Sequence, residues 1–204
     1  MLFFKPEYIQ LDKANGDALF VRKEVKPKKR TMVVVDDNHY AIFIKEGVYH
    51  NALSTGKYSV LNKGEKNVSK VEFIFLSKTN AIEVKWGTPS RLDMTWQDEH
   101  IKVGVSGTFE VQISDPRKVY FEFIQPDKDF SIEKMQDKLR SRMSSEIQPI
   151  LAKALQESNI AYDQMAQSCT ELSDIIKPTV LDMLNKDYGL KLCSFMLDAI
   201  LVDG

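Results

Sequence analysis

The segment IKVGVSGTFEVQIS, Ile101 to Ser114, has the clearest periodicity in the chain. Apolar and polar side chains alternate along it, which is typical of a strand with one packed and one solvated face. The apolar face holds Ile101, Val103, Val105, Phe109, Val111 and Ile113. Gly107 falls on the same face, where a missing side chain indicates a bulge, a bend or a close neighbour. Because antiparallel pairing usually leaves one face solvated, the segment predicts an antiparallel sheet.

Shorter alternating segments upstream predict further strands. A strand around Val33 and Val35 leads into turn residues at 36–38, and the alternation resumes over 40–44 before a second turn at 45–47. This order is a hairpin signal. Similar alternation occurs over 71–75 and 82–86. The N-terminal half is therefore predicted to form a mostly antiparallel sheet.

After Asp115-Pro116 the apolar spacing changes to intervals of three and four, which indicates a helix. Its apolar positions are Met135, Leu139, Met143, Ile147, Ile150, Leu151 and Ala154. Ser131 can cap the start of this helix, and Pro149 is expected to kink it or divide it in two.

A second helix is predicted from Ser168, which forms a capping-box pattern with Glu171, to a stop at Tyr188-Gly189. The segment LKLCSFMLDAILV, Leu190 to Val202, is apolar on both alternations, so it predicts a strand covered on both faces. The order of strands, helices and one further strand predicts an α+β, or mixed α/β, fold, with its helices after residue 130.

The stretch KWGTPSRLDM, Lys85 to Met94, could be a phosphate-binding loop, the rim of an active site or a corner between strands. A phosphate loop needs G-x-x-x-x-G-K-[ST] between a strand and a helix. Here one glycine is followed by Thr88 and Pro89, proline removes a backbone donor, and more strand follows. We therefore interpret the stretch as a structural corner that Gly87 and Pro89 turn and Trp86 anchors.

No local motif indicates a catalytic, cofactor or metal site. The histidines His39, His50 and His100 lie beside turn signals and lack metal-ligand spacing. Cys169 and Cys193 also lack such spacing and lie in segments predicted to be packed, which favours a reduced, cytosolic compartment over a disulfide framework. No histidine is near either cysteine, so neither indicates a thiol nucleophile. No run approaches the roughly 18 to 20 apolar residues that a membrane-spanning helix needs. We predict no catalytic residue, no cofactor and no metal.

The composition is that of an ordinary globular protein, with 43% hydrophobic residues, 28% charged residues and a net charge of -1. The only basic run, KPKKR, is a candidate contact for anionic lipid headgroups through Lys26, Lys28, Lys29 and Arg30, or a solvated loop before a strand. It lacks interleaved aromatic residues, which argues against nucleic acid. Apolar side chains at residues 2–4 are a second candidate membrane contact.

The segment from Lys85 to Tyr120 resembles the SPFH, or band 7, superfamily (stomatin, prohibitin, flotillin and relatives), and most closely its bacterial virion-core-protein-like subgroup. In that subgroup a KWGTP motif precedes a long strand that continues through G-[TS]-[FY] into a D-P-[RK]-[KR] corner. The matching residues are Lys85-Trp86-Gly87-Thr88-Pro89, Gly107-Thr108-Phe109 and Asp115-Pro116-Arg117-Lys118.

The resemblance implies a non-catalytic domain over residues 31–204 that self-associates and organises membrane proteins, preceded by a basic arm or strand at 1–30. It places the protein in the cytoplasm, held at a bacterial membrane through partners, to which the basic run could add peripheral contact with anionic lipid. The structural corner residues are then Trp86, Gly87, Pro89, Gly107, Asp115 and Pro116. The family's upstream anchor and downstream coiled coil are missing, so we expect a trimmed form.

Two alternatives remain open from the residues alone. One is a soluble enzyme or ligand-binding domain whose site is dispersed over the strand–helix junctions. The other is a nucleic-acid binder that uses the basic run.

Overall fold

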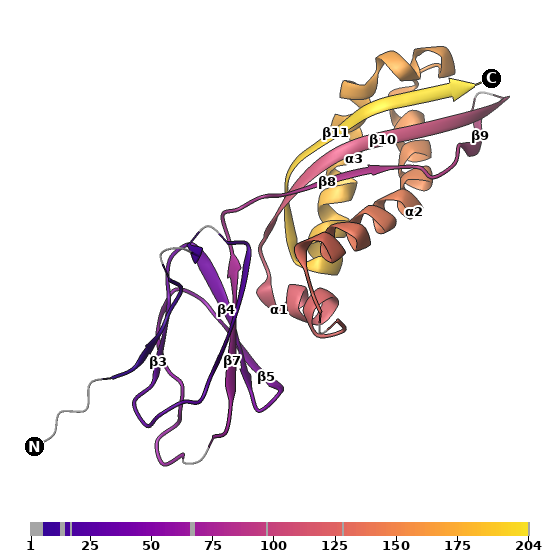
Figure 1. Ribbon diagram of the computed structural model, residues 1–204. Helices are drawn as coiled ribbons and strands as arrows, with labels where there is room; N and C mark the ends of the chain where they lie inside the picture. Colours follow the sequence, from indigo (N-terminus) through magenta and orange to yellow (C-terminus); the bar gives the residue numbers. More distant parts are fainter. Residues whose placement is uncertain are drawn as a thin grey trace, which may run out of the picture. The chain divides into compact units, whose positions relative to one another are not determined.

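The computed structural model describes residues 6–12, 15–16, 18–65, 68–96, 98–127 and 129–203 (Figure 1). Its contacts divide the chain into two compact units. Unit 1 comprises Met1–Asn80 and Ile113–Lys128, and unit 2 comprises Ala81–Gln112 and Asp129–Gly204. The chain on both sides of residue 30 contributes strands to unit 1.

Unit 1 contains two sheets. One has the strand order β1-β3-β6, formed by Tyr8–Ile9, Met32–Val35 and Gly56–Ser59. The other has the order β2-β7-β4-β5, formed by Phe20–Val25, Val71–Ser77, His39–Lys45 and Val48–Leu53. The β1–β3 pair is parallel and the other pairs are antiparallel, which confirms the mostly antiparallel N-terminal part of the fold.

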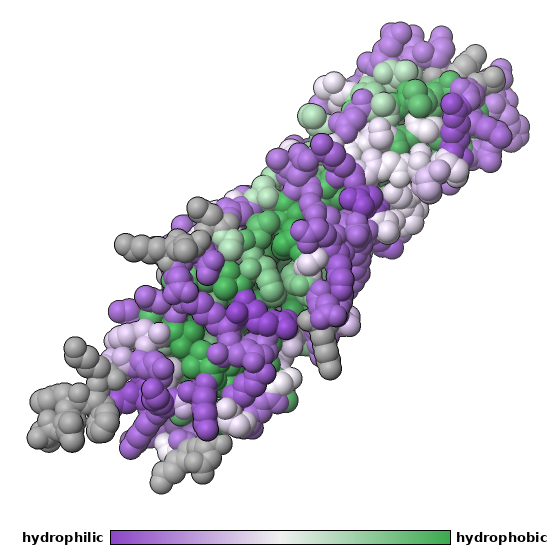
Figure 2. All heavy atoms as spheres, in the orientation of Figure 1, coloured by the Kyte–Doolittle hydropathy of each residue, from purple (hydrophilic) through white to green (hydrophobic). Residues whose placement is uncertain are grey.

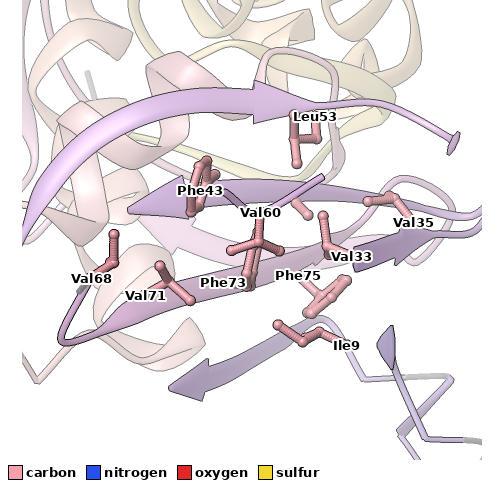
Figure 3. Close-up of a cluster of buried hydrophobic side chains, with 11 residues drawn as sticks. Ile9, Val33, Val35, Phe43, Leu53, Val60, Val68, Val71, Phe73 and Phe75 are labelled. Carbon is pink, nitrogen blue, oxygen red and sulfur yellow. The ribbon is translucent and has the colours of Figure 1, made fainter. Parts of the chain in front are cut away.

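The core of unit 1 lies between these two sheets. Phe43 of β4 and Phe73 of β7 are cross-strand partners, and their rings stack with centroids 4.9 Å apart. The buried side chains around them come from both sheets and the loops between them (Figure 3): Ile9, Val33, Val35, Ala41, Leu53, Val60, Val68, Val71 and Phe75. The two sheets therefore bury one face against each other.

The opposite face of β4 and β7 is buried as well. Ile42 and Ile74 pair on this face, and both are 0% exposed. The short helix α1 (Pro116–Val119) contacts β4 and β5, and the π-helical turn η2 (Tyr120–Ile124) follows it. The ring of Tyr49 contacts that of Tyr120 at 5.2 Å, and burial raises the pKa of both hydroxyls. The middle of β4 and β7 is thus covered on both sides.

The predicted hairpin around the turn at 36–38 is wrong. β3 pairs with β1 and β6, whereas β4 pairs with β5 and β7, so this turn carries the chain from one sheet to the other. The hairpin instead joins β4 to β5. Its turn residues Glu46 and Gly47 have φ angles of 50° and 81°, as two-residue hairpin turns of the favoured types require.

Unit 2 is one sheet with two long helices. The sheet is formed by β8 (Ile82–Gly87), β9 (Leu92–Trp96), β10 (Glu99–Ile113) and β11 (Leu190–Asp203). β10 is central, with β11 on one side and both β8 and β9 on the other. All the predicted core positions of β10 are buried, which confirms the alternation seen in the sequence.

The helices α2 (Ile132–Ser158) and α3 (Cys169–Met183) pack against each other and contact β8 and β11 respectively (Figure 1). A 3-10 helix η3 (Tyr162–Gln167) joins them, and the π-helical turn η4 (Leu184–Tyr188) ends at Gly189, whose φ is 68°. Together with β11 they confirm the predicted order of helices followed by a C-terminal strand.

The structure decides two details of the helix predictions. α2 runs unbroken through Pro149, so of the two predicted effects of this proline, a kink or a division, the division does not occur. Ser168 makes no capping hydrogen bond to α3, because its hydroxyl donates to the Gln164 carbonyl oxygen at 3.0 Å, which η3 brings within reach. The predicted cap of α2 is present: the Ser131 hydroxyl accepts from the Lys134 amide at 3.3 Å.

The expectation that β11 is covered on both faces is also wrong. Its side chains alternate between buried and exposed, and Met196 and Leu201 are 59% and 60% exposed. Figure 2 shows apolar atoms at the surface over the end of this strand, among hydrophilic ones. α3 packs against one face of β11. Among the described residues of unit 2, no helix packs in the same way on the exposed side chains of β11.

Candidate functional site

The KWGTP stretch lies in a bulge of an edge strand, so the interpretation that Gly87 and Pro89 turn the chain is corrected. β8 pairs antiparallel with β10 up to Gly87 opposite Ser106, and β9 continues along the same strand from Leu92 opposite Val103. Residues 88–91 therefore lie opposite only residues 104–105. Two additional residues on one strand widen the ladder without reversing the chain.

Thr88 holds this bulge against β10. Its amide donates to the Val105 carbonyl oxygen at 2.9 Å, and its hydroxyl oxygen accepts from the Val105 amide at 3.1 Å. Pro89, which has no amide hydrogen to donate, follows where the ladder is interrupted. The polar groups of Thr88 are used within the sheet, which argues for a structural role and against a phosphate loop.

The ring of Trp86 lies in the space that the missing side chain of Gly107 leaves. Trp86 is 4% exposed, pairs with Gly107 across the sheet and stacks on Phe195 of β11 with centroids 6.3 Å apart. A Cβ atom on Gly107 would lie 2.8 Å from Trp86 Cζ2 and 2.5 Å from the Met196 carbonyl oxygen. Of the three explanations for this glycine, the structure shows a close neighbour.

A row of polar side chains on α2 closes the outer edge of β8 and β9. The four donors are spaced by four residues, so they lie on one face of the helix. The hydrogen bonds run from Gln136 to the Glu83 oxygen (2.7 Å), Arg140 to Lys85 (2.9 Å), Ser144 to Gly87 (2.9 Å) and Gln148 to Asp93 (3.1 Å). All four acceptors are backbone carbonyls, so this edge is not open to another strand.

Asp115 and Pro116 start α1 immediately after β10. The Asp115 carboxylate accepts from the amides of Arg117 and Lys118 at 3.0 and 3.2 Å, which is an N-terminal cap. Pro116 occupies the first turn, where a missing amide hydrogen has no cost. The D-P-R-K motif is therefore the junction between a strand and a helix.

The basic run KPKKR forms the turn between β2 and β3 in unit 1. Thr31 anchors it, since its hydroxyl oxygen accepts from the Lys28 amide at 2.7 Å and its hydroxyl donates to Glu7 at 3.1 Å. Lys28 also pairs with Glu7 at 3.8 Å. The side chains of all four predicted lipid contacts are exposed. Residues 2–4 lie outside the described part of the chain.

The structure divides the four predicted lipid-contact residues into two pairs. Lys29 and Arg30 line a groove together with residues 59 and 61–65, whereas Lys26 and Lys28 do not. Lys63, on the far side of this groove, was not predicted. It lies in a loop distant from KPKKR in the sequence, and no basic run marks it.

His39 is the buried member of the three histidines and is 2% exposed. Its Nδ1 lies 2.7 Å from the Asp36 carboxylate, and its Nε2 contacts no polar partner among the described residues. Burial disfavours the ionised form of Asp36, but hydrogen bonds from His39 and Asn38 outweigh this and lower its pKa. The His39 ring is buried whereas the Asp36 side chain is 52% exposed, and their contact joins the turn at 36–38 to the start of β4, which indicates a structural pair.

The described residues thus define an α+β domain without a group of three or more side chains placed to hold a metal ion. None of the helices in the described ranges is long and apolar enough to cross a membrane. The family model of the SPFH domain-Band 7 family matches residues 19–203, so the chain belongs to this family. Its members are generally non-catalytic, membrane-associated scaffolds. No curated protein matches the chain.

Proposed function

We propose that this chain is a non-catalytic scaffold or interaction domain of the virion-core-protein-like subgroup. It organises proteins at the cytoplasmic face of a bacterial membrane. Membership of the SPFH family is the observation that carries the proposal. The use of the Thr88 amide and hydroxyl inside the sheet supports it, because this part of the KWGTP motif then serves the fold instead of a reaction.

The covered strand edges favour association through side-chain surfaces. α2 closes the β8–β9 edge, and the buried Ser173 hydroxyl of α3 accepts from the Leu197 amide of β11 at 2.8 Å. Strand addition at these positions is therefore blocked. The exposed apolar side chains of Met196 and Leu201 supply surface for partner proteins or a second copy.

Attachment to the membrane is peripheral and depends on partners. Each basic side chain near an anionic surface contributes about 1 kcal/mol, and firm anchoring by chains or charges generally takes two strong signals. The basic turn of unit 1 is one weak signal. We therefore expect weak, salt-sensitive lipid contact from the domain itself.

Affinity purification of the full-length protein from its own membranes tests this proposal. After mild crosslinking and detergent extraction, we expect integral membrane proteins among the captured partners, with an untagged strain as the control. Capture of soluble proteins alone would contradict a membrane scaffold.

The alternative of a ligand-binding domain makes a different prediction. A ligand at 100 times its dissociation constant stabilises a fold by about 2.7 kcal/mol. We expect no comparable thermal shift with ATP, GTP or Zn²⁺. A clear shift with any of them would favour the alternative.

A further inference from the structure

Unit 1 contains a groove of about 820 Å³ between the turn after β2 and the loop after β6. Lys29 and Arg30 line one side, and Lys63 lines the other. Pro27 and Leu61 supply apolar surface between these charges. Two segments far apart in the sequence therefore bring three cationic side chains to one concave surface.

The groove has an excess of positive charge. Its one acidic side chain, Glu65, forms an ion pair with Lys45 and accepts from the Asn62 amide at 2.9 Å. The hydrogen bond from Lys45 lowers the pKa of Glu65, so this carboxylate stays ionised and its charge is compensated. Glu65 therefore pairs with Lys45 and not with the groove lysines Lys29 and Lys63.

The lysines of the groove differ from their neighbour Lys28 in whether they pair with an acidic side chain. Lys28 pairs with Glu7, whereas Lys29 and Lys63 have no acidic partner within the described ranges. An unpaired ammonium group needs no existing ion pair to break before it binds an anion. Arg30 adds a planar guanidinium, whose fork of donors matches phosphate oxygens.

The loop also presents backbone donors. The Glu65 amide donates to the Asn62 carbonyl oxygen at 3.1 Å, which closes a turn with Lys63 and Gly64 at its centre. Gly64 has a φ of 91°, and neither central amide donates to an acceptor in the described chain. Successive free amides in a turn form a concavity that binds anions.

The geometry points to a binding site for a phosphate-type oxyanion, either a free phosphate compound or the headgroup of an anionic lipid. Lysine ammonium groups, the Arg30 guanidinium and the turn amides supply the donors. The site deepens the proposed function, and it rests on that function for the membrane as a source of the phosphate group. The residues proposed to contact the anion are therefore Lys29, Arg30 and Lys63, instead of the continuous run from Lys26 to Arg30.

Pyrophosphate is the probe for the free-anion source. We expect saturable shifts of the amide resonances of residues 62–64 when the ¹⁵N-labelled chain is titrated at low salt. In the double variant Lys29→Gln, Lys63→Gln the affinity falls by about tenfold or more, since two cations are lost. The variant Lys57→Gln, Lys191→Gln removes the same charge from exposed positions outside the groove and is the matched control.

Vesicles of phosphatidylglycerol or phosphatidylcholine test the lipid source with the same variants. The site is supported if the groove variant loses binding and the control variant does not. If this loss is seen with pyrophosphate but not with vesicles, the ligand is a free phosphate compound. If it is seen with phosphatidylglycerol vesicles, the ligand is a lipid headgroup. Absence of saturable binding to either probe, or equal loss in the control variant, overturns the inference. The proposed function fails on a different result, the absence of membrane proteins from the affinity capture.

Discussion

β7 and β11 are both apolar on both alternations of their sequence, yet their surroundings differ. β7 lies between β2 and β4, and it is buried on both faces, by the second sheet on one side and on the side of Ile74 and Leu76 as well. Among the described strands β11 lies beside β10 alone, and it packs one face on α3 and exposes Met196 and Leu201. An apolar run therefore shows that both faces of a strand can be buried. The position of the strand in the sheet decides whether both faces are buried.

The largest effects are expected on the faces that both strands bury. Phe73 of β7 is 0% exposed and Phe195 of β11 is 5% exposed, and each contacts another ring. We expect Phe73→Ala and Phe195→Ala each to lower the free energy of unfolding by about 3 to 5 kcal/mol. Urea denaturation measures both, and a loss below about 1 kcal/mol for either would show a loose core.

The second face of β7 distinguishes the two strands directly. Ile74 points away from Phe73 and is 0% exposed. We expect Ile74→Ala to cost about 2 to 5 kcal/mol, because it leaves a cavity at a fully buried position. A near-neutral result would mean that this face of β7 is as open as that of β11.

Gly107 tests how closely β11 approaches its neighbour. A Cβ at this position meets the backbone of Met196 at 2.5 Å, so Gly107→Ala is expected to destabilise by about 1 to 3 kcal/mol. Gly104→Ala in the same strand is the matched control, since its nearest contacts are at 3.7 Å. Equal effects at the two glycines would contradict the close approach.

The covered edge of β8 predicts a smaller effect. Ser144 donates to the Gly87 carbonyl oxygen, and Ser144→Ala is expected to cost about 1 kcal/mol. Ser145 donates only within its own helix, to Arg142, and Ser145→Ala is the control with little change. The difference in urea midpoint between the two variants measures the contribution of the edge contact.

The smallest effect is expected on the exposed face of β11. Met196→Ala is predicted to change the free energy of unfolding by within about 0.5 kcal/mol, because the side chain is 59% exposed. The same denaturation series gives the comparison with Ile74→Ala. A loss similar to that of Ile74→Ala would indicate that β11 is covered in solution, by a second copy or another protein.

Periodicity predicted most of the fold because it reports local burial. The alternation in β10 and the spacing in α2 were enough to identify these elements and the class. Pairing partners were not predictable, since the turn at 36–38 has the chemistry of a hairpin although it connects two sheets. For β11, the polar pairs Thr108–Asp198 and Ser194–Glu110 mark the exposed face, but only the neighbouring strand reveals them.

The groove was predictable only in part for the same reason. KPKKR is visible as a basic run, and its contact with lipid or phosphate remains a prediction. Lys63 carries no sequence signal, because its role depends on the approach of the loop after β6 to the turn after β2. The row of donors on α2 was missed as well, although polar residues spaced by four on an amphipathic helix are a usable signal.

The most direct test of recruitment through partners compares three membrane preparations. Native membrane vesicles with their cytoplasmic face outward, the same vesicles after protease treatment, and vesicles of the extracted lipids are each sedimented with the full-length protein at low and high salt. We expect salt-resistant binding to the untreated vesicles alone, and weak binding to the other two that disappears as salt shortens the Debye length below about 8 Å. Equal, salt-resistant binding to the extracted lipids would contradict recruitment by partner proteins.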